Sequence, residues 1–283
     1  MREDFAVRGH DIAIRDDILG LATALQAREL RSLAFAPALS LPEMTDSGEH
    51  INVGLANYIR RMLAERDVEI ATLSCYVNMI HPDACERAQS VARLSHYLQL
   101  APEFGTRIVV TETGSVDPNF AFTEDNFGDE PFAALLDAIA PLLQTAHENG
   151  VFLALEPGIN HPVYSLDRVE DVLTYFGYDA ALKLVLDPVS LITPGHDRAD
   201  EILREGFSRF GRQIVAVHIK DYEWTPNASR LIKPVLPGTG HVDMHQLITI
   251  AQSCQPYGIK CFDELGNDML DEVLRMPWIS KYQ

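Results

Sequence analysis

Four apolar segments of this sequence each end in a side chain that can bind a metal ion. They carry Glu156 in LALEP, Asp187 in LKLVLD, His218 in VAVHIKD and Glu264 in CFDEL. Burial of such a group without a partner is unfavourable by roughly several kcal/mol. A positive charge should therefore lie among them, and a divalent cation would satisfy their lone pairs.

The four residues recur at intervals of 31, 31 and 46 positions along the chain. Such spacing is typical of one strand and one helix per ligand, and it favours convergence on a single point. Taken singly, each residue could instead be a helix N-cap, a hydrogen-bond partner of a loop or a solvated rim residue. Three carboxylates and one imidazole favour Mn2+, Mg2+ or Co2+ over a thiolate-rich structural zinc site. We predict one divalent ion, with Mn2+ as the first choice.

The elements that must position these residues form a regular alternation of short apolar runs and segments with helical periodicity. Eight strands are predicted, at residues 4–9, 32–37, 68–76, 106–113, 151–157, 182–187, 214–221 and 259–265. Near-continuous apolar strands separated by helices predict an α/β fold, a (β/α)8 TIM barrel that spans residues 1–283 as a single domain. The alternative is a doubly wound open sheet, which usually carries a GxGxxG turn after its first strand, and this chain has none there.

Composition excludes several classes of partner. The formal net charge of −18 argues against nucleic acid and anionic membranes, which require a positive field. Neither a signal peptide nor an apolar run of membrane-spanning length is visible, so a cytoplasmic location is expected. The two longest irregular stretches, residues 114–128 and 222–241, follow strand ends and are predicted to shape a substrate pocket at the mouth of the barrel.

The sequence resembles the xylose-isomerase-like TIM-barrel superfamily, in particular its sugar isomerase/epimerase branch, over essentially the whole chain. The resemblance is carried by LALEPG, LVLDPVSL, VHIKD, LPGTGHVDM at residues 236–244, and CFDELG. It implies that Glu156, Asp187, His218 and Glu264 hold one divalent metal, and that Glu156 and Glu264 also act as acid and base. It further implies a sugar or cyclitol substrate and a possible homodimer.

The resemblance has one departure. Ketose 3-epimerases of this branch carry a substrate-binding His three residues after the metal-binding Asp, whereas this chain has Ser190 there. A hydroxyl can still bond a sugar, and His161 in GINHPVY could reach the substrate from the neighbouring strand end. Three further residues are predicted to bind substrate from strand ends or the long seventh loop, namely His10, Glu112 and Arg230. Tyr76 should also face the mouth, and an ion pair between strands is the simplest account of Lys220.

The expected function is metal-dependent isomerisation or epimerisation of a sugar or cyclitol, by proton abstraction next to a carbonyl through an enediolate. The alternative is a lyase or dehydratase that eliminates a β-leaving group from a 3-oxo sugar or inosose. Two other classes stay open. An abasic-site nuclease shares the barrel but conflicts with the acidic charge, and a metal-free binding protein is compatible with the fold alone.

Overall fold

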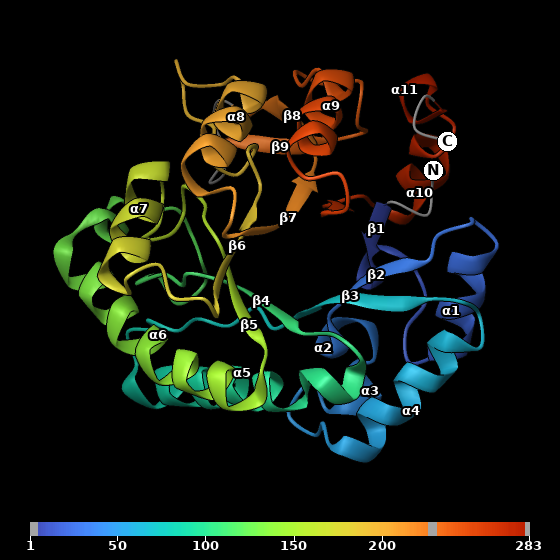
Figure 1. Ribbon diagram of the computed structural model, residues 1–283, viewed down its shortest axis with the longest axis horizontal. Helices are drawn as coiled ribbons and strands as arrows, with labels where there is room; N and C mark the ends of the chain where they lie inside the picture. Colours follow the sequence, from blue (N-terminus) through green and yellow to red (C-terminus); the bar gives the residue numbers. More distant parts are fainter. Residues whose placement is uncertain (1–4, 226–230, 281–283) are drawn as a thin grey trace.

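A computed structural model describes residues 5–225 and 231–280. In this part of the chain, eight parallel strands close into a barrel in the order β1-β10-β7-β6-β5-β4-β3-β2, with helices around it (Figure 1). The strands are β1 (Phe5–Arg8), β2 (Ser32–Phe35), β3 (Glu69–Ser74), β4 (Ile108–Glu112), β5 (Phe152–Glu156), β6 (Leu182–Leu186), β7 (Ile214–Ile219) and β10 (Ile259–Phe262). The predicted (β/α)8 barrel is therefore confirmed, and the open sheet is excluded.

The helices begin and end at capping residues that the sequence supplies. Asp17 and Ser165 accept hydrogen bonds from backbone N–H groups at two helix starts, and α6 ends at Gly150 in the left-handed region, with φ of 62°. The longer helices are α1 (Ile18–Gln26), α4 (Val53–Ala64), α5 (Ala84–Phe104), α6 (Asp129–Asn149), α7 (Leu166–Tyr175), α8 (Ala199–Phe210), α9 (Met244–Cys254) and α10 (Asn267–Val273). The shorter ones are η2 (Gly9–Asp11), α2 (Pro37–Ser40), α3 (Pro42–Thr45), η3 (Glu124–Phe127) and α11 (Pro277–Ser280).

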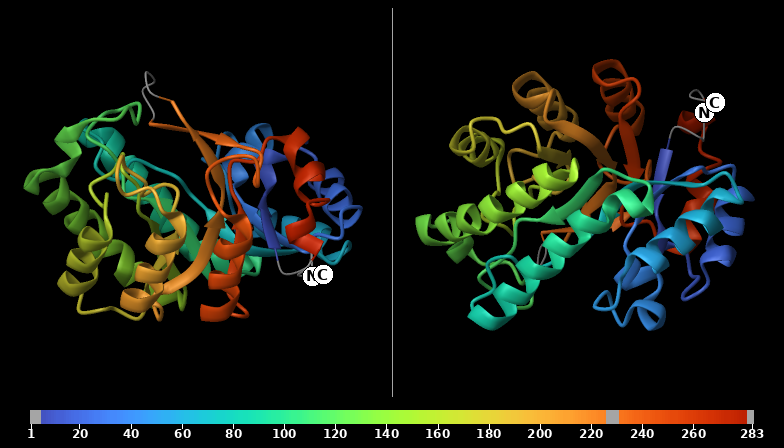
Figure 2. Two further views of the ribbon diagram at one scale, coloured as in Figure 1. Left: turned by 90° about the horizontal axis from the view of Figure 1, so that it is seen from above. Right: turned by 60° about the horizontal axis from the view of Figure 1, so that its bottom comes forward.

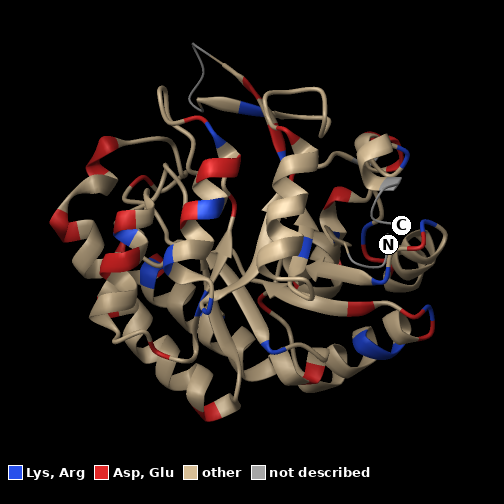
Figure 3. Ribbon diagram, turned by 45° about the horizontal axis from the view of Figure 1, so that its top comes forward, with Lys and Arg blue, Asp and Glu red and all other residues tan. Residues whose placement is uncertain are grey.

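The outer helices carry much of the acidic charge (Figure 3). None of the described helices combines the length and the apolar character needed to cross a bilayer.

The interior of the barrel is filled by small side chains. One cluster comes from β4 to β7, and a second comes from β1, β2 and β10: Val110, Ala154, Val185 and Ala216, then Ala6, Ala34 and Cys261. Side chains alternate between the two faces of a strand, so the residue two positions further along also faces inward, at the carboxyl end of the barrel. The register thus fixes which side chains can meet there.

The predicted irregular stretch 222–241 contains regular structure, which corrects that prediction. Strands β8 (Asp221–Trp224) and β9 (Ile232–Val235) pair antiparallel, with Trp224 opposite Ile232. This hairpin follows β7 directly and rises above the barrel (Figure 2). The other stretch, 114–128, is irregular except for η3.

The buried carboxylate of Asp221 ties the start of the hairpin to the loop that follows β9. Its Oδ1 accepts N–H bonds from Tyr222 at 2.8 Å and Val242 at 2.9 Å, and its Oδ2 accepts them from Gly238 at 2.9 Å and Gly240 at 2.8 Å. Gly240 approaches so closely that a Cβ there would lie 2.4 Å from the carbonyl oxygen of Tyr222. One side chain therefore organises both ends of the hairpin.

We expect Asp221→Asn to lower the free energy of unfolding by roughly 2–3 kcal/mol, because an amide NH2 would face two backbone N–H donors. Urea unfolding monitored by circular dichroism measures this loss. Asp117→Asn is the matched control, since Asp117 accepts two N–H bonds in an exposed turn, at 2.8 and 3.0 Å. Equal losses in the two variants would contradict the role given to Asp221.

Candidate metal centre and active site

Four buried side chains converge at the carboxyl end of the barrel. Glu156 ends β5, Asp187 follows β6, His218 lies in β7 and Asp263 follows β10. Each offers a ligand atom, and these atoms all lie within 4.8 Å of one another. Each of the four comes two positions after a small residue of the barrel interior, so strand alternation alone brings them together.

The fourth member of this group differs from the sequence prediction, which placed Glu264 there. Asp263 faces inward because Cys261, two residues earlier, faces inward, whereas Phe262 packs outward against Phe5, with ring centroids 5.0 Å apart. Glu264 lies outside the group. Its backbone is in the left-handed region, with φ of 52°, and its Oε2 lies 3.0 Å from Lys220 Nζ.

Hydrogen bonds within the group fix its side chains. His218 Nδ1 lies 2.9 Å from Glu156 Oε1, and the Tyr76 hydroxyl donates to Glu156 Oε2 at 3.1 Å. Asp187 Oδ1 accepts the backbone N–H groups of Val189 at 2.8 Å and Ser190 at 3.2 Å. These contacts hold two of the carboxylates in place before any ligand binds.

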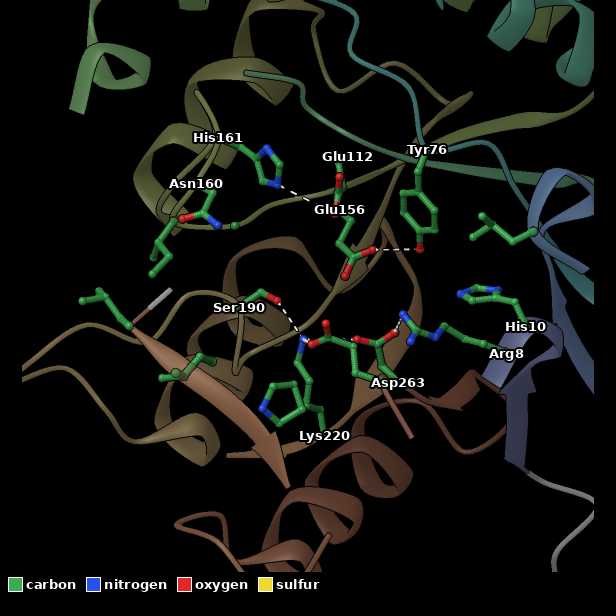
Figure 4. A pocket seen from close by; sticks show the side chains of 17 residues that line it. Arg8, His10, Tyr76, Glu112, Glu156, Asn160, His161, Ser190, Lys220 and Asp263 are labelled. Atoms are coloured by element: carbon green, nitrogen blue, oxygen red, sulfur yellow. Dashed lines mark hydrogen bonds and ion pairs between the residues drawn. The ribbon is translucent and has the colours of Figure 1, made fainter. Parts of the chain in front are cut away.

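Two cations also reach the group. Lys220 Nζ lies 2.7 Å from Asp187 Oδ2 and 3.1 Å from Asp263 Oδ2, which confirms the expected ion pair between strands. Arg8, which sequence reasoning missed, lies 2.8 Å from Asp263 Oδ1 through its Nη1 and forms a two-pronged contact with Asp11. Figure 4 shows both cations beside Asp263.

The charges of the group depend on one another. Burial lowers the pKa of His218, but Glu156 and Asp263 outweigh it and raise that pKa to about 9. For Asp263, burial raises the pKa. The charge of Lys220, followed by those of His218 and Arg8, outweighs burial and holds this pKa well below its usual range. Without a metal at neutral pH, imidazolium and ammonium groups therefore balance the carboxylates.

The residues predicted to bind substrate lie in the wall of one pocket, with a single exception. His10, Glu112, His161 and Ser190 all line a pocket of about 320 Å3. Arg230 lies outside the described residues. The pocket is also lined by Glu264 and by two of the four candidate metal ligands, Glu156 and Asp263 (Figure 4).

Two histidines of this wall lie in different surroundings. His161 Nδ1 donates to the carbonyl oxygen of Gly114 at 2.8 Å, and its Nε2 lies 3.9 Å from Glu112 Oε1. Burial, followed by the charge of Arg8, lowers the pKa of His10 to about 4. His10 Nδ1 is buried and has no hydrogen-bond partner among the described residues.

Ser190 lines the pocket, and its hydroxyl also bonds two residues of the charged cluster. Its hydroxyl donates to Asp187 Oδ2 at 2.8 Å and accepts from Lys220 Nζ at 3.2 Å. The position at which ketose 3-epimerases have an imidazole is thus taken up by a hydroxyl that already has two partners.

The donor set fits a divalent cation. Three carboxylates and one imidazole, all buried and mutually within 4.8 Å, form the oxygen-rich environment that Mg2+ and Mn2+ prefer, and the same set is compatible with zinc or cobalt. Nothing in this set selects manganese among them.

A family model described as xylose isomerase-like TIM barrel matches residues 35–257. The chain belongs to this family. The sequence resemblance is thereby confirmed, and the match covers the strands that carry Glu156, Asp187 and His218. No curated protein sequence matches this chain.

Solved structures with the same fold cover nearly all of this xylose isomerase-like barrel. The probable 3-DHS dehydratase AsbF of Bacillus anthracis is 13% identical, over 96% of this chain and 97% of that one, with a TM-score of 0.74. The 3-keto-D-glucoside 4-epimerase YcjR of E. coli is 14% identical, over 98% and 99%, with a TM-score of 0.72. The IOLI protein with a bound zinc atom is 16% identical, over 99% of both chains, with a TM-score of 0.73. At these identities the likeness establishes the fold alone.

Proposed function

We propose that this protein is a divalent-metal-dependent isomerase or epimerase that removes a proton next to a carbonyl group of a sugar or cyclitol. The observation that carries the proposal is the meeting of four buried metal-capable side chains, two of which, Glu156 and Asp263, line a pocket with hydrogen-bonding groups. Glu156, Asp187, His218 and Asp263 would hold the ion, which would polarise the carbonyl and acidify the adjacent C–H bond. The names of the dehydratase and epimerase above are compatible with this chemistry.

Two glutamates are positioned to move the proton. Glu156 and Glu264 both line the pocket, and they come from β5 and β10, which are separated by β6 and β7 in the barrel order. Burial raises the pKa of Glu264, but Lys220 outweighs it and lowers that pKa, so the carboxylate is ionised and able to accept a proton. A base and an acid on different walls can remove a proton from one face of a substrate and return it on another.

Elimination is the second candidate reaction, because it begins with the same proton abstraction. The engaged hydroxyl of Ser190 favours it, since the free imidazole that binds ketoses in ketose 3-epimerases has no counterpart at this position. A β-leaving group would then depart from a 3-oxo sugar or inosose before the proton is returned.

Hydrogen exchange in D2O tests the shared first step. Protein stripped with a chelator and reloaded with Mn2+, Mg2+, Co2+ or Zn2+ is incubated with ketohexoses, inososes and 3-oxo-glucosides and followed by NMR. We expect deuterium to enter beside the carbonyl only in metal-loaded samples, with a new epimer or isomer for the first reaction and a released leaving group for the second. Equal exchange with and without metal, or none on any of these compounds, would refute the proposal.

A further inference from the structure

The pocket has apolar lining residues that a sugar or cyclitol alone does not require. Five of its lining residues are purely apolar and come from three separate parts of the chain, namely Leu39, Ile159, Leu231, Ile232 and Pro234. Leu39 belongs to α2, Ile159 follows β5, and Ile232 and Pro234 belong to β9. They share the pocket with the carboxylates of the candidate metal centre.

The two β9 residues lie on one face of the hairpin. Ile232 and Pro234 are two positions apart in β9, so both point to the same side, while Lys233 points to the other. Trp224 and Tyr222 pair opposite them, and Tyr222 is buried against the barrel core. The hairpin therefore turns its apolar face toward the barrel.

Leu39 contributes apolar surface from another element. Its side chain is 47% exposed, although it lines the pocket together with residues of the hairpin. Single exposed leucines are common. Leu39, however, lines the same cavity as the apolar residues of β9, and apolar lining is typical of small-molecule sites.

The charges of the pocket indicate that this part of the ligand is neutral. Among the described residues that line it, the cations are Arg8 and Lys220, and both are paired with carboxylates. A phosphate or carboxylate substituent would find Glu112 and Glu264 in the same wall, and the described lining residues offer it no cation besides Arg8 and Lys220.

We propose that the substrate is a sugar that carries a neutral, apolar substituent, such as an aryl or alkyl glycoside. Its polyol end lies against the candidate metal centre, and its substituent lies against Leu39, Ile159 and Ile232. This inference rests on the proposed function, since it names the substrate class of the same pocket.

Binding of two unreactive glucosides tests the proposal. Isothermal titration calorimetry on the metal-loaded protein compares phenyl β-glucoside with methyl β-glucoside, which share the sugar and differ in the substituent. We expect the phenyl compound to bind at least about tenfold more tightly, because its ring is removed from water. Affinities within twofold of each other, or binding by neither compound, would overturn the proposal.

Variants of the apolar lining residues test where the phenyl group of the glucoside binds. Leu39→Ser and Ile232→Ser should each reduce the ratio of the two affinities about threefold or more, because the phenyl compound loses more apolar contact than the methyl compound. Val53→Ser is the matched control, because Val53 is 53% exposed at the start of α4 and does not line the pocket. Leu39 is exposed enough for its variant to fold even if Ile232→Ser does not. A ratio that neither pocket variant changes would refute the assignment.

The outcome is independent of the reaction test. These glucosides have no carbonyl and do not turn over, so the affinity ratio can fail while metal-dependent deuterium exchange of free sugars succeeds. The reverse result would leave the apolar subsite standing and refute the proposed chemistry.

Discussion

Asp263→Asn is expected to weaken binding of a divalent metal by at least about 100-fold and to lower kcat by about 10³-fold or more. Asp263 offers its carboxylate within 4.8 Å of the other three ligand atoms, and a neutral amide would be a weak ligand there. Glu264→Gln should keep the metal but lose turnover, because an amide cannot accept a proton. Metal analysis after dialysis measures the retained metal, calorimetric titration measures the metal affinity, and steady-state kinetics measures kcat.

Asp263→Glu is the control for this pair, because it retains the charge that Arg8 and Lys220 require. We expect it to keep most of the metal affinity and to melt close to the wild type. Loss of metal from Glu264→Gln with retention in Asp263→Asn would instead restore the sequence prediction that Glu264 is the ligand.

The difference between Asp263 and Glu264 shows where a sequence argument about strand ends loses precision. The runs Ala154-Leu155-Glu156 and Ala216-Val217-His218 each place a small residue two positions before a candidate metal ligand. The run Cys261-Phe262-Asp263 repeats this pattern, and so does Ala6-Val7-Arg8, which ends in the missed arginine. Counting alternation from the small residue, and not from the last polar one, would have identified both.

The eight barrel strands were predictable because each is a short, mostly apolar run between helices, and packing on both faces demands such a composition. The β8–β9 hairpin was not, because Pro234 disfavours a strand and the pairing depends on Asp221, which binds Gly238 and Gly240 far along the chain. The presence of Leu39 and β9 in the lining of one pocket is likewise a consequence of barrel closure and leaves no local pattern. The predicted homodimer, the cytoplasmic location and the preference for manganese stay predictions.

Lys220→Met is expected to lower the free energy of unfolding of the metal-free protein by about 3–5 kcal/mol, because it leaves Asp187 and Asp263 buried without their ammonium partner. Urea unfolding in the presence of a chelator measures this loss. Lys260→Met is the matched control, because Lys260 is also buried but its Nζ bonds the carbonyl oxygen of Gly258 at 2.9 Å, outside the candidate metal centre.

Saturating Mn2+ should recover most of the stability lost in Lys220→Met and raise its apparent metal affinity at least about tenfold above that of the wild type. The reason is that Asp187 already accepts four hydrogen bonds, two on Oδ1 from Val189 and Ser190 and two on Oδ2 from Ser190 and Lys220. A carboxylate has about four lone-pair positions, so a metal at Asp187 must displace a donor, and the ammonium is the one that the metal's own charge replaces. Lys260→Met should leave the metal affinity unchanged. Weaker metal binding by Lys220→Met than by the wild type would show that Lys220 positions the ligands and does not compete for them.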